Sequence, residues 1–187
     1  MRQGDPEDLD IVSLRKGMLL PETRVVLEVG NVMIPESNIA LSAVVASSVF
    51  VTLYDSETKR GGAGMFLRAV PPEGQAATPL FGLPLCAALL RSFMSSGSKT
   101  ETLTAGIFGG AWPEWANSAQ REISRANVEV VRDVMRRKGI PIADEDTGGH
   151  RGRKLVYVTG TNEIAILRTE RVRRTDWFPG SGDEGGI

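Results

Sequence analysis

The pattern of apolar and polar residues predicts strands in the first half of the chain. Three segments, at 25–31, 39–45 and 48–55, are rich in Val, Leu, Phe and Tyr, which suit a pleated, half-buried surface. A polar turn at 55–62 ends in two glycines, and residues 63–70 then form the expected returning strand. We therefore expect β-structure to dominate this part of the chain.

Apolar residues spaced three and four apart predict two helices. The first lies within residues 79–97, with Gly97 as its expected C-terminal cap. The second runs over 119–138 and is ended by Gly139, with Pro141 just beyond. The expected apolar faces are Leu83, Cys86, Ala87, Leu90, Phe93 and Met94 in the first helix, and Ile123, Ala126, Val130, Val134 and Met135 in the second.

Three further short strands are expected at 103–108, 154–159 and 163–168. The complete set, about seven strands and two helices, indicates an α+β domain. We expect its elements to be arranged in layers rather than as a βαβ repeat.

Composition narrows the class of protein. The chain has 187 residues, of which 41% are hydrophobic and 24% charged, and its net charge of −1 gives no electrostatic footprint for nucleic acid. No apolar run reaches the roughly 18–20 residues of a membrane-spanning helix, and the polar, acidic start is unlike a secretory signal. We expect a cytoplasmic protein without membrane insertion, with one domain at 23–169 between a loose lead-in at 1–22 and a mobile tail at 170–187.

Common site motifs are absent from the sequence. No glycine-rich nucleotide fingerprint and no nucleophile elbow is present, and one His with one Cys does not make the usual zinc ligand set. We therefore expect no cofactor and no metal. Asp144 and Asp146 flank Glu145, and such a cluster can bind Mg²⁺ or Ca²⁺, although a solvated loop is the simpler interpretation.

Two single residues have titratable groups of interest. His150 is the only histidine and stands in a glycine-rich loop, where it is either an exposed polar residue or a general base. Cys86 is the only cysteine and falls on the apolar face of its helix. A packed core thiol of this kind is a weak nucleophile, because burial raises its pKa.

Glycine-rich segments stand at 108–111 (FGGA), 146–149 (DTGG) and 152–154 (GRK). Glycine loses more conformational entropy on folding than other residues. It is therefore expected where the backbone must approach another group closely or adopt a positive φ. Between them lies ISRANV at 123–128, and upstream lies VTLYDSETKRGG at 51–62. In this order, the segments resemble the bacterial chemoreceptor glutamine deamidases of the CheD family.

The resemblance covers roughly residues 23–168. It implies a three-layer α/β/β fold with mixed β-sheets, of the cysteine-hydrolase type also seen in deamidating toxins. It also implies conversion of receptor glutamines to glutamate with release of ammonia, and partnership with chemoreceptors and the CheC phosphatase. In that chemistry a thiolate attacks the carboxamide carbon, a histidine activates the thiol and protonates the ammonia, and a polar group orients the imidazole.

The positions that match the family's catalytic residues hold different side chains here. The nucleophile position holds Ser48, the base position Met65, and the orienting threonine position Ser42. Serine needs a base to remove its proton, and a thioether cannot act as that base. Val44 and Ala46 replace two loop glycines, so we expect the loop to have another shape.

The resemblance therefore predicts a catalytically inactive, CheD-like chemotaxis protein that binds a receptor or a CheC-like partner. One alternative is an amidohydrolase rebuilt around Ser48, with His150 as the base and Asp144 or Asp146 orienting its ring. Another is a structural or regulatory module with no tie to chemotaxis.

Candidate partner-binding residues follow from the tryptophans and the glycine-rich segments. Trp112 and Trp115 are either anchors for a partner, since Trp is enriched at binding hot spots, or a cover for the rim of the core. The pair Trp177-Phe178 in the tail is a second candidate. The expected partner-binding set is Phe108, Gly109, Gly110, Trp112, Trp115, Gly148 and Gly149.

Overall fold

The structure is a computed structural model, and it describes residues 18–169, 172–173 and 176–177. The expected lead-in up to residue 17, and most of the expected tail including Phe178, lie outside the described residues. The described elements are β1 (Arg24–Val26), β2 (Val32–Met33), β3 (Ala40–Val45), β4 (Val49–Asp55), β5 (Arg60–Phe66), α1 (Gly82–Ser95), the short 3₁₀ helix η2 (Thr100–Thr102), β6 (Leu103–Gly109), α2 (Ser118–Lys138), β7 (Ile142–Thr147), β8 (Gly152–Val158) and β9 (Glu163–Thr169).

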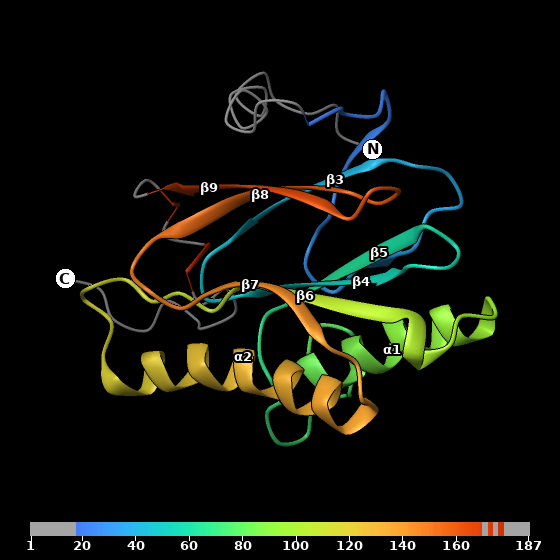
Figure 1. The fold of residues 1–187 in the computed structure, drawn as a ribbon. Helices are drawn as coiled ribbons and strands as arrows, with labels where there is room; N and C mark the ends of the chain where they lie inside the picture. The colour runs from blue at the N-terminus through green and yellow to red at the C-terminus, as the bar shows by residue number, and fades with distance from the viewer. Residues whose placement is uncertain (1–17, 170–171, 174–175, 178–187) are drawn as a thin grey trace.

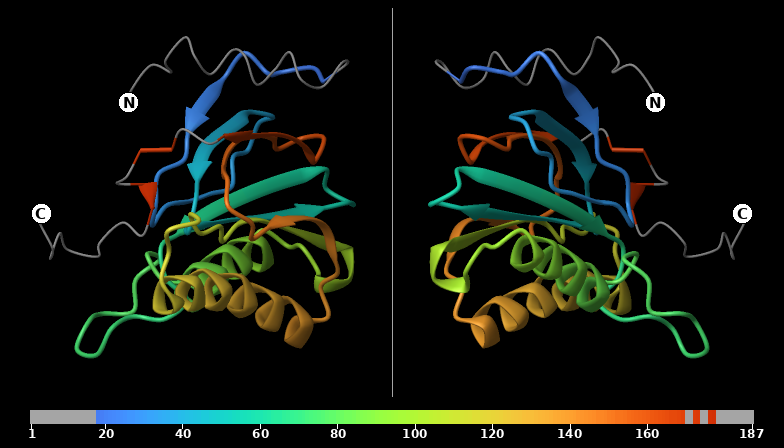
Figure 2. Two further views of the ribbon diagram at one scale, coloured as in Figure 1. Left: turned by 90° about the vertical axis from the view of Figure 1, so that its left-hand side faces the viewer. Right: turned by 90° about the vertical axis from the view of Figure 1, so that its right-hand side faces the viewer.

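The elements form three layers (Figure 1). A four-stranded sheet of order β1-β3-β8-β9 packs on a five-stranded sheet of order β2-β5-β4-β6-β7, and both helices cover the other face of the second sheet. The side views in Figure 2 show the helices on one side of the stack only. Both sheets are mixed, because β1 runs parallel to β3 and β6 runs parallel to β7. The expected three-layer α+β fold is confirmed.

Alternation along the strands divides the apolar side chains between the layers. In β4, Val49 and Val51 point into the cluster beneath the helices, whereas Phe50 points into the cluster between the two sheets. A third, smaller cluster lies on the outer face of the four-stranded sheet, where Met18 from the expected lead-in packs against Val156. The buried apolar side chains therefore form separate clusters on the faces of the two sheets, and the turn that contains Ser48 lies where β4 begins.

The helices confirm their expected positions, but the buried face of α1 differs from the expected one. Leu83 and Met94, expected on that face, are 47% and 39% exposed. Cys86, Leu90 and Phe93 are buried as expected, and the rest of the buried face is formed by Gly82, Leu85 and Leu89. The apolar spacing gave the helix but not its rotation, since both candidate faces carry apolar residues.

Helix α2 begins and ends with strong signals. Asn117 caps its first turn, accepting a bond from Gln120 N while the Gln120 side chain accepts from Asn117 N. At the other end Gly139 has a φ of 68°, the left-handed conformation expected of a C-terminal glycine. The helix boundaries could therefore be predicted to within about a residue or two.

One predicted loop is a strand. Residues Ile142–Thr147, expected as a solvated acidic loop, form β7. Because α2 connects β6 to this parallel neighbour, β6, α2 and β7 make a βαβ unit inside the layered fold. Acidic residues are depleted in strands, but β7 lies at the edge of its sheet, where charged side chains are tolerated.

Candidate functional site

Ser48 lies in the turn between β3 and β4, and the FGGA segment holds this turn by its backbone. Gly110 N donates to Ser48 O over 2.9 Å, and Ala111 N donates to Ala46 O over 2.7 Å. Gly109 has a φ of 117°, and a Cβ built there would lie 2.2 Å from Ser48 O. Only glycine fits at that position. Ser48 itself is 4% exposed.

Asn127 of α2 fixes the same turn from the helix side. Its Nδ2 donates to Ser47 O over 2.9 Å and to Leu67 O over 2.8 Å, so it links the turn to the end of β5. Its side chain is fully buried. The sequence predicted no role for Asn127 beyond its place in the RANV segment. The signal that could have identified it is a polar residue on the buried face of α2, which it shares with Ser124, Val128, Val131 and Met135.

Met65 lies on β5 directly opposite Phe50 of β4. Its side chain is 6% exposed and belongs to the apolar cluster between the sheets, together with Leu27 and Leu41. A thioether has no proton to donate and is only a weak acceptor. Met65, which the resemblance predicts to occupy the family's base position, is therefore part of the core.

Ser42 faces away from that cluster. Its neighbour along β3, Leu41, points between the sheets, and its cross-strand partner Val156 belongs to the outer cluster. The Ser42 hydroxyl donates to Val25 O over 3.4 Å. Ser42 and Met65 thus lie on opposite sides of the four-stranded sheet, which does not bring them together as an orienting pair.

His150 lies in the exposed loop between β7 and β8. Its Nδ1 is 3.2 Å from Trp112 O, and its ring meets the Trp112 ring edge-on at 6.0 Å between centroids. A carbonyl accepts only, so this contact requires a proton on Nδ1 and leaves Nε2 as the acceptor of a neutral ring. The loop pairs His150 with Trp112, and Ser48 is not among its hydrogen-bond partners within the described residues.

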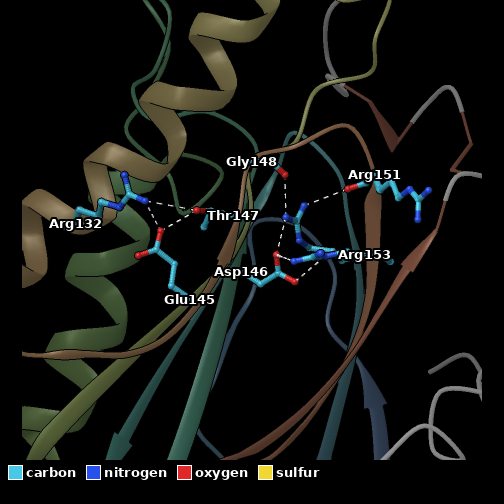
Figure 3. A network of polar contacts seen from close by, with 8 residues as sticks. Arg132, Glu145, Asp146, Thr147, Gly148, Arg151 and Arg153 are labelled. Atoms are coloured by element: carbon cyan, nitrogen blue, oxygen red, sulfur yellow. Dashed lines mark hydrogen bonds and ion pairs between the residues drawn. The ribbon is translucent and has the colours of Figure 1, made fainter.

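The DTGG and GRK segments meet in an ion-pair network (Figure 3). Arg153 of β8 is 2% exposed, and its Nη2 donates to Asp146 Oδ1 and to Gly148 O, each over 2.8 Å. Its Nη1 donates to Arg151 O over 3.1 Å. Arg168 of β9 also binds Asp146, over 3.0 Å. Burial alone raises the pKa of Asp146, but the hydrogen bonds from Arg168 and Arg153 outweigh it and hold this pKa below its usual value.

This network joins the two sheets, because Asp146 belongs to the five-stranded sheet and both arginines to the other. Asp146 is thus committed to arginines and makes no hydrogen bond to His150 within the described part of the chain. On the same strand, Glu145 binds Arg132 of α2 and accepts a bond from Thr147 Oγ1 over 2.7 Å. No group of acidic, His or Cys side chains that could hold a metal ion is found among the described residues.

Three residues expected to bind a partner are buried. Phe108 is 1% exposed and packs between the sheets, and Gly109 and Gly110 are buried beneath the Ser48 turn. None of the three offers exposed surface in this structure, and Gly110 instead donates a backbone hydrogen bond to the Ser48 turn. Partner binding by the expected set stays a prediction. Trp115, in contrast, is 59% exposed, and Trp112 is half-buried.

Gly148 and Gly149 form the tip of the β7–β8 loop, with φ values of 69° and 73°. Gly148 N donates to Gly109 O over 2.9 Å, and Trp112 N donates to Gly149 O over 3.0 Å. The loop after β6 and the β7–β8 loop are thus held together by their backbones. Trp177 lines a cavity beside them, with Trp115 and His150.

These features define the class of protein: a three-layer α+β domain in which the backbone of a glycine-rich segment clamps the turn between two strands. A family model described as CheD chemotactic sensory transduction matches residues 72–168. The matched region contains the FGGA, RANV, DTGG and GRK segments, whereas Ser42, Ser48 and Met65 lie before it.

Relatives that carry the CheD name match a longer part of the chain than the family model does. The chain is 30% identical over 134 residues to a probable chemoreceptor glutamine deamidase CheD 1 of Anaeromyxobacter dehalogenans, covering 72% of this chain and 78% of that protein. It is 32% identical over 148 residues to a probable chemoreceptor glutamine deamidase CheD 2 of Geobacter metallireducens, covering 73% and 91%. The chain belongs to the CheD family. Within the described residues, no helix is both long and apolar enough to cross a membrane.

Proposed function

We propose that this chain is a catalytically inactive member of the CheD family that acts by binding a chemoreceptor or a CheC-like partner. The observation that carries the proposal is the position of Met65, whose thioether lies in the apolar cluster between the sheets beside Phe50. Removing a general base typically costs about 10²–10⁴-fold in rate, and serine depends on a base more strongly than a thiol does.

The relatives support a receptor as the partner, since two of them are named as probable chemoreceptor glutamine deamidases. A chain that keeps the fold without the nucleophile and base retains a surface for recognising such a substrate. We propose the cytoplasm as its location on the same ground, and a CheC-like protein as the second possible partner.

A rebuilt hydrolase would need Ser48 Oγ and a ring nitrogen of His150 within about 2.6–3.2 Å. The contact of His150 with Trp112 O, and the commitment of Asp146 to Arg153 and Arg168, argue against this arrangement. Inactivity is therefore the better-supported alternative.

The experiment measures ammonia release and binding on the same sample. The purified chain is incubated with a glutamine-bearing cytoplasmic fragment of a chemoreceptor, with an active CheD relative as the positive control. We expect no ammonia above background, and capture of the receptor fragment or of a CheC-like protein in a pull-down. Ammonia release that is abolished by Ser48→Ala would overturn the proposal, and so would a folded sample that captures neither protein.

A further inference from the structure

A cavity of about 630 Å³ lies where three parts of the chain meet. The loop after β6, the β7–β8 loop and the described residues after β9 all contribute to it. This volume is in the range of about 300–1,000 Å³ that is typical of ligand sites. We call it the tryptophan pocket, and its lining residues are Pro113, Glu114, Trp115, His150, Arg151, Val172 and Trp177.

The walls of the tryptophan pocket are rich in aromatic surface. Trp115 and Trp177 line it, and Trp112 supports the lining His150 through its ring and its carbonyl oxygen. These are the three tryptophans of the chain. Trp115 is 59% exposed, so a large apolar side chain stands open to solvent at the pocket. Exposed Trp of this kind is the residue type most enriched at binding hot spots.

The surroundings of the pocket carry more positive than negative groups. Arg151 and Glu114 are the two charged residues of its lining. Arg125 of α2 stands over the Trp112 ring, 5.6 Å from its centroid. Arg121 of the same helix donates from Nε to Ala116 O over 3.0 Å. A carbonyl oxygen carries no formal charge, so this hydrogen bond does not neutralise the guanidinium. The charge pattern therefore suits an anionic ligand.

Specific contacts hold the walls of the pocket in place. Backbone bonds join its two main loops, and the buried Arg153 holds the carbonyl of Arg151 at 3.1 Å. Val172 packs so closely on Gly152 that a Cβ there would lie 2.1 Å from it. A preformed site of this kind loses less conformational entropy on binding.

We propose that the tryptophan pocket binds an acidic peptide segment of a protein partner that bears a large apolar side chain. The apolar side chain packs against Trp115 and Trp177, and its neighbouring carboxylates face Arg121 and Arg125 of α2. The inference deepens the proposed function and rests on it for the statement that the partner is a protein.

The first test uses intrinsic fluorescence, because two of the three tryptophans line the pocket and the third, Trp112, contacts the lining His150. The full chain is titrated with a synthetic helical peptide of alternating Glu and Leu positions, and with a twin in which every Glu is Gln. We expect the Glu peptide to change the emission and to bind at least about tenfold more tightly than its twin, with an affinity that falls as salt is added. Equal affinities for the two peptides, or no binding of either, would overturn the proposal.

The second test uses a dye-labelled peptide, whose anisotropy does not depend on the protein's own tryptophans. Trp115→Ala and Arg125→Ala should each weaken binding, the first by about tenfold or more. Val70→Ala and Arg91→Ala are the matched controls, because both residues are exposed outside the pocket and should leave the affinity unchanged. Equal weakening by test and control variants would contradict the assignment.

The readouts separate this inference from the proposed function. If the chain captures a receptor or CheC-like protein and Trp115→Ala captures it equally well, the pocket assignment fails and the proposed function stands. If the chain releases ammonia, the proposed inactivity fails while the peptide affinities still decide the role of the pocket.

Discussion

A thioether sulfur carries no proton, and in Met65 that sulfur lies among apolar side chains rather than beside a polar group. At the turn, the hydroxyl of Ser48 belongs to a residue that is almost fully buried. We therefore expect that a thiol at position 48 and an imidazole at position 65 would not be sufficient for catalysis. Ala46 lies in the turn, fully buried, and its carbonyl accepts a hydrogen bond from Ala111 N, whereas Val44, expected as a loop residue, lies within strand β3.

The double variant Ser48→Cys, Met65→His tests whether a thiol and an imidazole alone restore catalysis. We expect it to release ammonia from a glutamine-bearing receptor fragment at least about 10²-fold more slowly than an active CheD relative, since a misplaced reacting group costs about that much. Circular dichroism of the variant checks that it is folded. Turnover at the rate of the relative would show that Val44 and Ala46 do not matter.

The resemblance assigns Ser48 and Met65 to the family's nucleophile and base positions from the order of segments along the chain, and this assignment stays a prediction. The resemblance could not predict that Phe108 is buried, or that Asp146 meets Arg153, since each depends on which face of a strand meets another layer. Those relations join residues from different sheets.

At the scale of elements, the clamp between β6 and the Ser48 turn depends on one glycine. Gly109→Ala should destabilise the fold by about 3 kcal/mol or more, because it adds a close contact with Ser48 O to the strain of a positive φ. Gly97→Ala is the matched control, since Gly97 has a φ of 92° with open space around it, and its cost of about 1 kcal/mol reflects the backbone alone. Urea denaturation measures both, and equal losses would contradict the clamp.

The edge strand β7 depends on its ion pairs with the other sheet. Asp146→Asn should cost about 3 kcal/mol, because it leaves the buried Arg153 without its counter-charge. Asp144→Asn, at an exposed position on the same strand, should change the stability by less than about 0.5 kcal/mol.

The pH dependence follows from the lowered pKa of Asp146. A carboxyl whose pKa is lower in the folded than in the unfolded chain adds stability above its unfolded value of about 3.9, and this stability is lost as the pH falls through the folded pKa. Unfolding measured between about pH 6 and pH 2 should therefore show a smaller acid-induced loss for Asp146→Asn than for the natural chain. Identical slopes would refute the contribution.

The helices and most strands could be predicted because their signals are local: a period of 3.6 or alternation, with caps such as Asn117 and Gly139. β7 could not, because its residues are acidic and its stabilising partners, Arg132, Arg153 and Arg168, come from other elements. A local pattern does not contain that information.

At the scale of the whole molecule, the single thiol lies in the layer between α1 and the five-stranded sheet. Cys86 is fully buried, and this burial raises its pKa to about 12. A thiol reagent at pH 8 should therefore label the native chain only as fast as the fold opens, whereas the chain in urea reacts at once. Rapid labelling without denaturant would contradict this packing.

The pairing of β3 with β8 determines when the outer sheet can form during synthesis. Ala40 lies opposite Val158, so an early strand must wait for one of the last to leave the ribosome. Until β8 is synthesised, one edge of β3 has no strand to pair with, and its apolar residues Leu41 and Val45 lack the β8 side chains of their cluster. A nascent or shortened chain that stops before β8 should therefore need a chaperone, even though both of its helices are already complete.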